Sequence, residues 1–393
     1  MINLAKRYKA NTLFLAIAFT SLLGACGGGG SSDDTTPTTP TTPTTPTTDL
    51  PTEFGDYLTA LTDNHIIPSY AAMLTEAQAL KSAGDVFCAL TSPTSSELAT
   101  YQDAWSNFNS AWQKIQWVKV GAVVEDSRLF RIQLWPDEND AVSRGVETLL
   151  IEQITITADE VSGVNVGGQG IPALEYLLFP EDQDYSLLNA IDKEKRCEVS
   201  LAIAQNLVNM SDDIVTDWQA SAGNYRAEFI EGTGDFSSVV DSVEELVTNW
   251  LEHIEIVEDS KLFEILGDES PGNYEDAEHV LTDQSLTSIA TNIETFLTIY
   301  TNDDEKGFDS ILIEFLEQQS ISDEITASLT SVSSQITQIN TDFDSYETAL
   351  ADTAGREALS NLVDEMRVLI DLIDISFTQA LDLNLGFNSS DGD

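Results

Sequence analysis

The chain has 393 residues and carries 67 acidic against 17 basic side chains, which gives a net charge of −50. Nucleic-acid binding needs clustered Lys and Arg against the phosphates, and the sequence has no such cluster, so nucleic acid is excluded as a partner. The same charge disfavours adhesion to an anionic membrane surface. A hydrophobic content of 42% excludes a wholly disordered chain, and the length suits one large domain or two ordinary ones.

Residues 1–25 have the pattern of a lipoprotein signal peptide. Lys6, Arg7 and Lys9 are followed by a 13-residue apolar stretch that is too short to span a bilayer. The stretch ends in Leu-Gly-Ala before Cys26, which resembles a bacterial lipobox. We therefore expect cleavage and lipidation at Cys26, which would anchor the chain to a membrane. The alternative is an ordinary signal peptide followed by a chance cysteine.

Residues 26–50 have the composition of a tether. Glycines and serines come first, and Thr-Thr-Pro repeats then continue to Thr48, so little apolar surface is present to bury. At about 3.1 Å per residue, some 20 residues of such a segment reach roughly 60 Å from a membrane. Gly27 rather than Asp follows Cys26, which resembles an outer-membrane address. We expect a lipid-anchored protein of the cell envelope, in the outer membrane.

Cys88 and Cys197 remain if Cys26 carries lipid. Two leftover thiols in an oxidising compartment usually pair, so we expect a disulfide that closes a loop of about 110 residues. Such a bridge contributes about 4 kcal/mol in the chain-entropy model. Two buried free thiols are the alternative. A zinc site is disfavoured because no CxxC or HxxxH motif accompanies them.

The rest of the chain shows helical periodicity. Apolar residues recur at three- and four-residue spacing from Leu98 to Ile115, from Val239 to Val257, from Ile325 to Leu350 and from Leu359 to Ile373. Further helices fit 54–84 with a kink near Pro68, 190–219, 285–300 and 308–318. Only residues 161–166 have the composition of an extended segment.

The fold class predicted from this pattern is all-α, with two helical-bundle halves built from long antiparallel helices. Glycine breaks between the apolar stripes favour bundles with loops over one long coiled coil. A stretch from Ala222 to Asp235 lacks periodicity and contains three glycines, so we place the boundary there. We expect a first bundle at 51–222, a second bundle at 236–385 and a flexible tail at 386–393.

A glycine-rich loop, Gly167-Gly168-Gln169-Gly170, precedes the segment Ile171 to Phe179. Its spacing imitates a dinucleotide-binding fingerprint, but the following helix stops near Pro180 and no second strand with an acidic residue follows. A Rossmann site is therefore disfavoured.

The same residues resemble the imelysin-like family, whose members carry a GxHxxE motif. Gly170 and Glu175 keep that motif, whereas Pro172 stands where the His belongs. Arg131 to Asp137, with Trp135 and Pro136, resembles the Arg…Trp-Pro-Asp segment of the family. Ser285-Leu286 with Asn292, and the ending 386–393, are similar to later family segments. The resemblance covers most of the chain from Glu53 onward.

This resemblance implies an all-helical fold, a cell-envelope role linked to iron uptake and a disputed peptidase label. A His and a Glu at i and i+3 share one helix face and can hold a cation together, but Pro172 supplies no imidazole. Pro is suited to the first helical turn, where a carboxylate at Glu175 is also favoured. Two interpretations of the segment from Gly170 to Glu175 therefore remain: an ordinary helix start, or a polar site that the chain has retained.

For the polar site we expect Glu175 to group with Arg131 and Asp137, near Gly170 and Trp135. Trp135 is better read as a packed aromatic than as a ligand contact. A carboxylate beside an Arg is a poor site for a bare transition metal and a better site for an anionic or chelated ligand.

The three histidines do not form a metalloenzyme motif. His253 lies on an apolar stripe, which indicates a core residue with its polar atoms satisfied. His65 precedes an Ile-Ile-Pro segment and has a weak case for lining a pocket. His279 adjoins Glu275, Asp276 and Glu278, which favours a solvated surface run over a weak site for a hard cation.

Three functions remain open at this stage. The first is a non-catalytic binding protein that captures iron, another metal ion or a metal complex, together with iron-uptake partner proteins. The second is a metallopeptidase of the imelysin type, which the missing His disfavours. The third is a structural scaffold of the envelope. No Ser/His/Asp or Cys/His arrangement indicates nucleophilic catalysis.

Overall fold

Amphipathic helices account for nearly all of the regular structure in the computed structural model, which describes residues 49–137 and 139–385. The predictions for the signal peptide, Cys26, the tether to Thr48 and the tail at 386–393 lie outside the described residues. No strand occurs within the described ranges, so the predicted all-α fold class is confirmed. The buried apolar side chains of these helices form one contiguous core.

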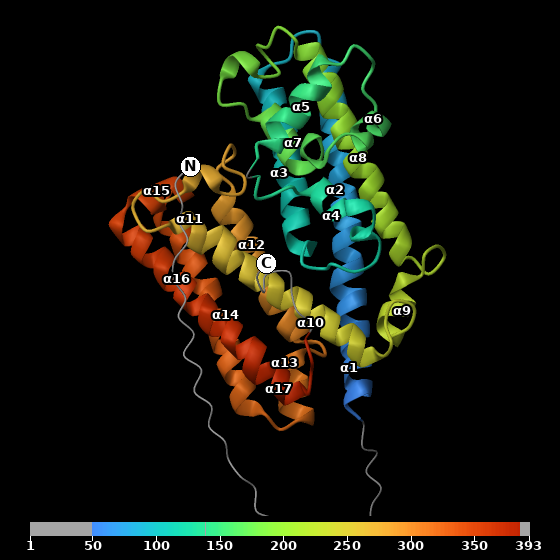
Figure 1. The fold of residues 1–393 in the computed structure, drawn as a ribbon, viewed down its shortest axis with the longest axis vertical. Helices are drawn as coiled ribbons and strands as arrows, with labels where there is room; N and C mark the ends of the chain where they lie inside the picture. The colour runs from blue at the N-terminus through green and yellow to red at the C-terminus, as the bar shows by residue number, and fades with distance from the viewer. Residues whose placement is uncertain (1–48, 138, 386–393) are drawn as a thin grey trace, which may run out of the picture. The chain divides into compact units, whose positions relative to one another are not determined.

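The first half is built on the long pair α2 and α8, which pack against each other (Figure 1). In chain order they are α1 (Leu50–Leu61), α2 (Ile67–Cys88), α3 (Ser95–Ile115), α4 (Arg128–Ile132), α5 (Ala141–Ile151), α6 (Ala158–Gly163), α7 (Gly170–Leu178), α8 (Lys193–Trp218) and α9 (Tyr225–Glu231). One-turn 3₁₀ helices lie between them at η2 (Gly121–Val123), η3 (Glu125–Ser127), η4 (Val166–Gly168) and η5 (Gln183–Tyr185).

The second half packs α14 against both α12 and α16. Its helices are α10 (Val239–Ile256), α11 (Glu264–Leu266), α12 (Ser285–Thr301), α13 (Phe308–Ser310), α14 (Gln319–Asp342), α15 (Tyr346–Ala351), α16 (Thr353–Asp371) and α17 (Thr378–Leu381). Short 3₁₀ helices occur at η7 (Tyr274–Asp276) and η8 (Asn302–Asp304). Wider π-helical turns occur at η6 (Val257–Phe263), η9 (Ile311–Phe315) and η10 (Leu372–Phe377). The first half has one such turn among its described residues, η1 (Thr62–Ile66), between α1 and α2.

Helix α3 shows how the sequence pattern sets the packing. Thr94 and Glu97 form a reciprocal capping box that satisfies backbone N–H groups at the helix start. Every residue of the predicted apolar stripe from Leu98 to Ile115 is buried. This stripe faces α2 in the first half and α12 in the second half. Helix α3 therefore packs between the two halves, in contact with α2 and α7 of the first half and α12 of the second.

The disulfide between Cys88 and Cys197 is present, with an S–S distance of 2.06 Å and a Cα–Cα distance of 5.8 Å. It joins the end of α2 to the second turn of α8, so it fixes these two antiparallel helices near one end. The predicted pairing is confirmed.

Several predicted elements differ in detail. Of residues 161–166, expected to be extended, only Val164 and Asn165 have an extended backbone. Residues 161–163 belong to α6, which Thr157 and Glu160 cap, and Val166 begins η4. The continuous helix predicted from Ile325 to Leu350 breaks at Phe343, whose backbone is extended, and Ser345 caps the start of α15. The kink expected near Pro68 is a π-helical turn at η1 just before that proline.

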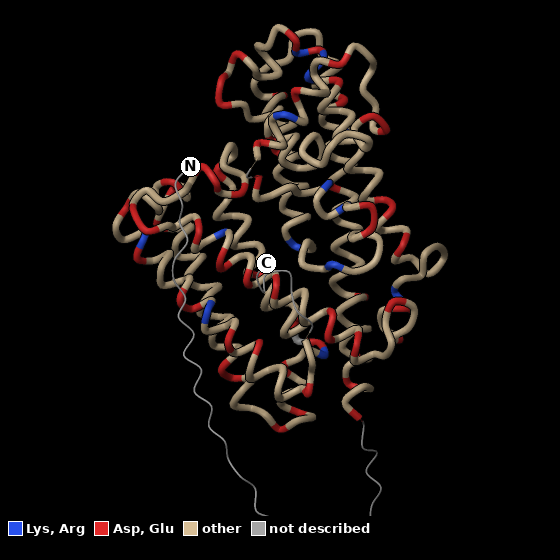
Figure 2. The backbone as a smooth tube through the Cα atoms, in the orientation of Figure 1, with Lys and Arg blue, Asp and Glu red and all other residues tan. Residues whose placement is uncertain are grey.

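Acidic positions are spread over both halves, and basic positions are sparse (Figure 2). None of the helices in the described ranges is long and apolar enough to cross a membrane.

Candidate functional site

A cavity of about 820 Å³ lies between the two halves. The first half contributes the segment from Gln133 to Asp137, the start of α5, and Pro172, Glu175 and Tyr176 of α7. The second half contributes Ser260 of η6, the start of α11 and much of the loop from Asn273 to Leu281. Trp135 joins the two walls, because its indole N–H donates to the carbonyl of Asp276 at 3.1 Å.

Glu175 and His279 meet at the inner end of this cavity. Glu175 is 5% exposed and His279 is 4% exposed, and His279 Nδ1 lies 3.1 Å from Glu175 Oε2. The other carboxylate oxygen, Oε1, has only a long contact of 3.4 Å with the Thr282 hydroxyl. Trp105 of α3 orders both partners, since its ring packs edge-on against His279 and its N–H donates to the carbonyl of Ile171.

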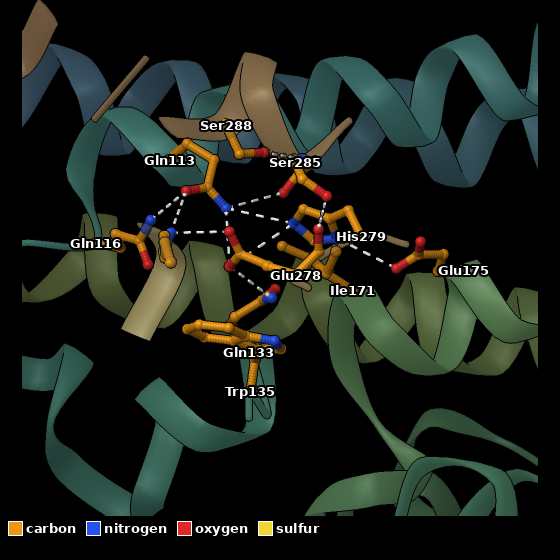
Figure 3. Close-up of polar contacts among 12 residues, drawn as sticks. Gln113, Gln116, Gln133, Trp135, Ile171, Glu175, Glu278, His279, Ser285 and Ser288 are labelled. Atoms are coloured by element: carbon orange, nitrogen blue, oxygen red, sulfur yellow. Dashed lines mark hydrogen bonds and ion pairs between the residues drawn. The ribbon is translucent and has the colours of Figure 1, made fainter. Parts of the chain in front are cut away.

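Behind His279 lies a buried polar network centred on Glu278 (Figure 3). Lys261 Nζ donates to Glu278 Oε2 at 2.8 Å, and both side chains are 3% exposed. Gln133 donates to Glu278 Oε1 at 3.0 Å and Gln113 at 3.3 Å. Lys261 also donates to Asn292 Oδ1 at 2.9 Å, so the ion pair is surrounded by hydrogen-bonding side chains.

The two ring nitrogens of His279 face different partners. Nδ1 lies 3.1 Å from a carboxylate oxygen of Glu175, and because a carboxylate accepts, Nδ1–H is the donor in this contact. Nε2 lies 3.4 Å from the amide nitrogen of Gln113 and 3.8 Å from Glu278 Oε1. The Nδ1–H group therefore orients the Glu175 carboxylate at the cavity wall.

Burial opposes ionisation of Glu278, but the charges of Lys261 and His279 and the hydrogen bonds from Lys261 and Gln113 outweigh it. The pKa of Glu278 is therefore held below its ordinary value of 4.5. The carboxylate is ionised at neutral pH and the Lys261–Glu278 pair is a buried ion pair. This pair holds the loop that carries His279.

Gly170 and Arg131, two predicted site residues, are not part of the cavity wall. Gly170 has a φ of +74°, and a Cβ there would come within 2.3 Å of the carbonyl oxygen of Ile132, so glycine is needed for close packing. Arg131 Nε donates to Gln169 Oε1 at 2.9 Å, and its Nη2 lies 3.4 Å from Asn206 Oδ1. The structure therefore does not group Arg131 with Glu175.

Asp137 and Trp135 do line the cavity together with Glu175. Both carboxylate oxygens of Asp137 accept backbone N–H groups at the start of α5, from Ala141 at 2.7 Å and Val142 at 2.9 Å. Asp137 thus holds the wall in shape as a helix cap. The Trp135 ring has the Lys261 ammonium 5.9 Å from its centroid, so it packs between the cavity and the buried network.

His279 corrects the sequence expectation most strongly. The run from Glu275 to His279 was expected to be a solvated surface, but only its first two residues are exposed and the last three are buried. The chain is buried from Ala277 to His279, and His279 has a left-handed backbone with a φ of 60°. Lys261, Gln113 and Gln133 were also missed, because isolated polar residues on helical stripes carry no motif.

The other two histidines lie elsewhere. His253 is buried as expected, at 2% exposed, and packs edge-on against Phe296, but its Nε2 has no hydrogen-bond partner. His65 lines a smaller cavity of about 260 Å³, with its Nε2 3.7 Å from Asp303 Oδ2.

The described residues contain no group of three or more His, Cys, Asp or Glu side chains placed to hold one metal ion. Pro172 lines the cavity, and its ring offers no ligand atom. The imidazole of His279 reaches Glu175 from the second half.

The Imelysin family model, which carries a peptidase label, matches residues 66–373. A comparison with curated proteins finds no match. An imelysin-like protein from Psychrobacter arcticum 273-4 has a crystal structure similar to this chain, with a TM-score of 0.69 and 20% identity over 85% of this chain and 97% of that one.

A second solved structure is similar to a comparable extent. It is a protein from Parabacteroides distasonis ATCC 8503 assigned as an iron-regulated protein A precursor, with a TM-score of 0.68 and 15% identity over 84% of this chain and 96% of that one. Identities this low establish the shared fold. The family model covers well over half of the sequence, and on that ground the chain belongs to the Imelysin family.

Proposed function

We propose that this chain is a binding protein of the cell envelope that captures a positively charged ligand, a metal ion or a metal complex, for iron uptake. The observation that carries the proposal is the charge of the cavity. Apart from His279, the charged side chains that line it are all acidic: Asp137, Asp140, Glu175, Glu264, Glu275 and Asp276. Such a wall attracts cations and repels anions.

The proposal revises the ligand expected from the sequence. An anionic or chelated ligand was expected because Arg131 was grouped with Glu175. Arg131 donates to Gln169 and Asn206 instead, and the described residues that line the cavity include no arginine to pair with an anion. The ordered Glu175 carboxylate suits a cation instead.

The iron link rests on the family and on the name of the Parabacteroides structure. The localisation to the cell envelope rests on the lipobox. A lipid anchor at Cys26 in the outer membrane and iron-uptake partner proteins are further parts of the proposal.

A metallopeptidase would need a metal-bound water beside a base. The described residues group too few metal ligands for that site, so binding without catalysis is the function that we favour.

Calorimetry on the purified full-length protein tests the proposal. Bare cations, cationic metal complexes and the anionic ferric citrate are titrated in parallel. We expect at least one cationic species to bind with one-to-one stoichiometry. Because a charge-assisted hydrogen bond contributes about 1.5–3 kcal/mol, Glu175→Gln should weaken that binding by about tenfold or more.

Glu194→Gln is the matched control, because Glu194 is exposed and does not line the cavity. Its affinity should equal that of the wild type. Binding of ferric citrate alone, or metal-dependent peptide cleavage by the wild type, would contradict the proposed function.

A further inference from the structure

We propose that the cavity binds a bulky polycation that carries several N–H donors. The protein contacts these N–H groups by hydrogen bonds and does not coordinate a bare metal ion directly. The chemical class is a polyamine or a metal complex with ammine or amine ligands. This inference rests on the proposed function and specifies how the cation is held.

The acidic side chains of the cavity are spread around its wall. Six carboxylates line the cavity, yet no three ligating side chains of the described residues converge on one point. A bare transition metal needs several ligands within about 2–2.3 Å of the ion. Carboxylates spread around a wall are instead suited to a ligand whose positive charge is also spread, with each carboxylate accepting from a separate N–H group.

The cavity is also much larger than a single metal ion. A cavity of about 820 Å³ is in the range that encloses a small organic molecule or a whole metal complex. A single ion held directly by protein side chains would fill only a small part of it. The aromatic and apolar residues of the wall, Trp135, Pro136 and Tyr176 among them, provide surface for the body of a larger ligand.

Glu175 supplies an acceptor at the inner end of the cavity. It is 5% exposed, its Oε2 accepts from His279, and its Oε1 has only the 3.4 Å contact with Thr282. Oε1 therefore has spare acceptor capacity, and an N–H group of a ligand would satisfy it.

His279 sets the chemistry of this end. Its Nδ1–H donates to Glu175 and its Nε2 faces Gln113, so neither ring nitrogen is directed at the cavity. The imidazole thus positions the carboxylate and does not offer itself as a metal ligand. Pro172, which lines the cavity beside Glu175, offers no ligand atom from its ring.

Hexaamminecobalt(III) is the deciding probe, because its six ammine groups do not exchange and it can be bound only through N–H contacts. Calorimetry compares it with spermidine and with Zn²⁺ on the full-length protein. We expect one-to-one binding of hexaamminecobalt(III) or spermidine, and at least about tenfold weaker binding of Zn²⁺. Binding of one and not the other distinguishes a metal complex from a polyamine, and either result supports the proposal.

Two variants keep the test independent of folding. Glu175→Gln should lower the affinity for the N–H polycation by about tenfold or more. Glu275 is an exposed residue of the cavity wall, so the fold should tolerate Glu275→Gln. This variant should lower the affinity for the polycation by about two- to fivefold. Glu194→Gln should leave it unchanged.

Tight binding of Zn²⁺ that depends on Glu175, with no binding of either N–H polycation, would overturn this inference and leave the proposed function standing. Absence of binding by all cations would overturn both. Polycation binding that is unchanged in both Glu175→Gln and Glu275→Gln would place the ligand elsewhere and also overturn the inference.

Discussion

Glu278 and Glu175 are two carboxylates with almost the same burial, 4% and 5% exposed, but their surroundings differ. Glu278 lies in the closed network and accepts from Lys261, Gln133 and Gln113. Glu175 lies at the cavity wall and has one short partner, His279. The first carboxylate is satisfied by the protein itself, whereas the second retains acceptor capacity toward the cavity.

This difference separates a structural charge from a binding charge. A buried ion pair with all its hydrogen bonds made fixes the geometry of its neighbours, at a desolvation cost that leaves little net stability. Here it fixes the loop that brings His279 to Glu175. The closed network therefore supports the open site, and the two regions should respond differently to substitution.

The largest effect should come from breaking the closed pair. Lys261→Met leaves Glu278 buried without its cation, so we expect a loss of about 3–5 kcal/mol in the free energy of unfolding. Urea denaturation followed by circular dichroism measures it. The double variant Lys261→Met/Glu278→Gln removes both charges and should be more stable than Lys261→Met alone. A loss below about 1 kcal/mol in Lys261→Met would mean that the pair is not closed to water.

Loss of the disulfide should destabilise the fold to a similar or slightly smaller extent without touching the site. Cys88 and Cys197 are 109 positions apart, and removing a native bridge typically costs about 2–5 kcal/mol. The double variant Cys88→Ser/Cys197→Ser should show this loss in the same urea assay and keep its ligand affinity at low temperature.

The disulfide variant also serves as the stability control for the comparison. If it binds ligand normally while Lys261→Met does not, the loss in Lys261→Met reflects the displaced His279 loop and not low stability. Equal loss of binding in both variants would remove the distinction between the two regions.

The elements that sequence reasoning predicted well are those with local causes. Helix α3 follows from the spacing of Leu98 to Ile115, and the disulfide follows from two leftover thiols in an oxidising compartment. The break at Phe343 was missed because the apolar stripe continues across it to Tyr346, so periodicity alone shows one helix. The cap at Ser345 is the local signal that marks the break.

The site was predicted only in part, because its contacts are long-range. Glu175 was found through a motif, but its partner His279 is 104 positions away in another half of the chain. The acidic neighbours of His279 indicated a surface, and nothing local shows that the chain turns inward at Ala277. Arg131 was grouped with Glu175 by motif order, whereas packing directs it to Gln169.

The smallest effect on stability should come from His253, a buried base without an acidic partner. His253 is as buried as His279, but it packs against Phe296, and its Nε2 has no hydrogen-bond partner. Burial, together with the charges of Lys261 and Lys119, lowers the pKa of His253 well below its ordinary value of 6.5. His253 is therefore neutral in the folded protein, while the unfolded chain takes up a proton near pH 6.5.

The unfolded state then binds more protons below pH 6.5, so the folded state loses stability as the pH falls through that value. We expect about 1 kcal/mol of stability to be lost between pH 6.5 and about pH 5.5 from this group. His253→Leu removes the titration and should show a shallower acid dependence in urea denaturation at matched pH values. Parallel curves for the wild type and His253→Leu would show that His253 takes up its proton in the folded state. The comparison between buried groups that have a charged partner and buried groups that lack one would then not extend to His253.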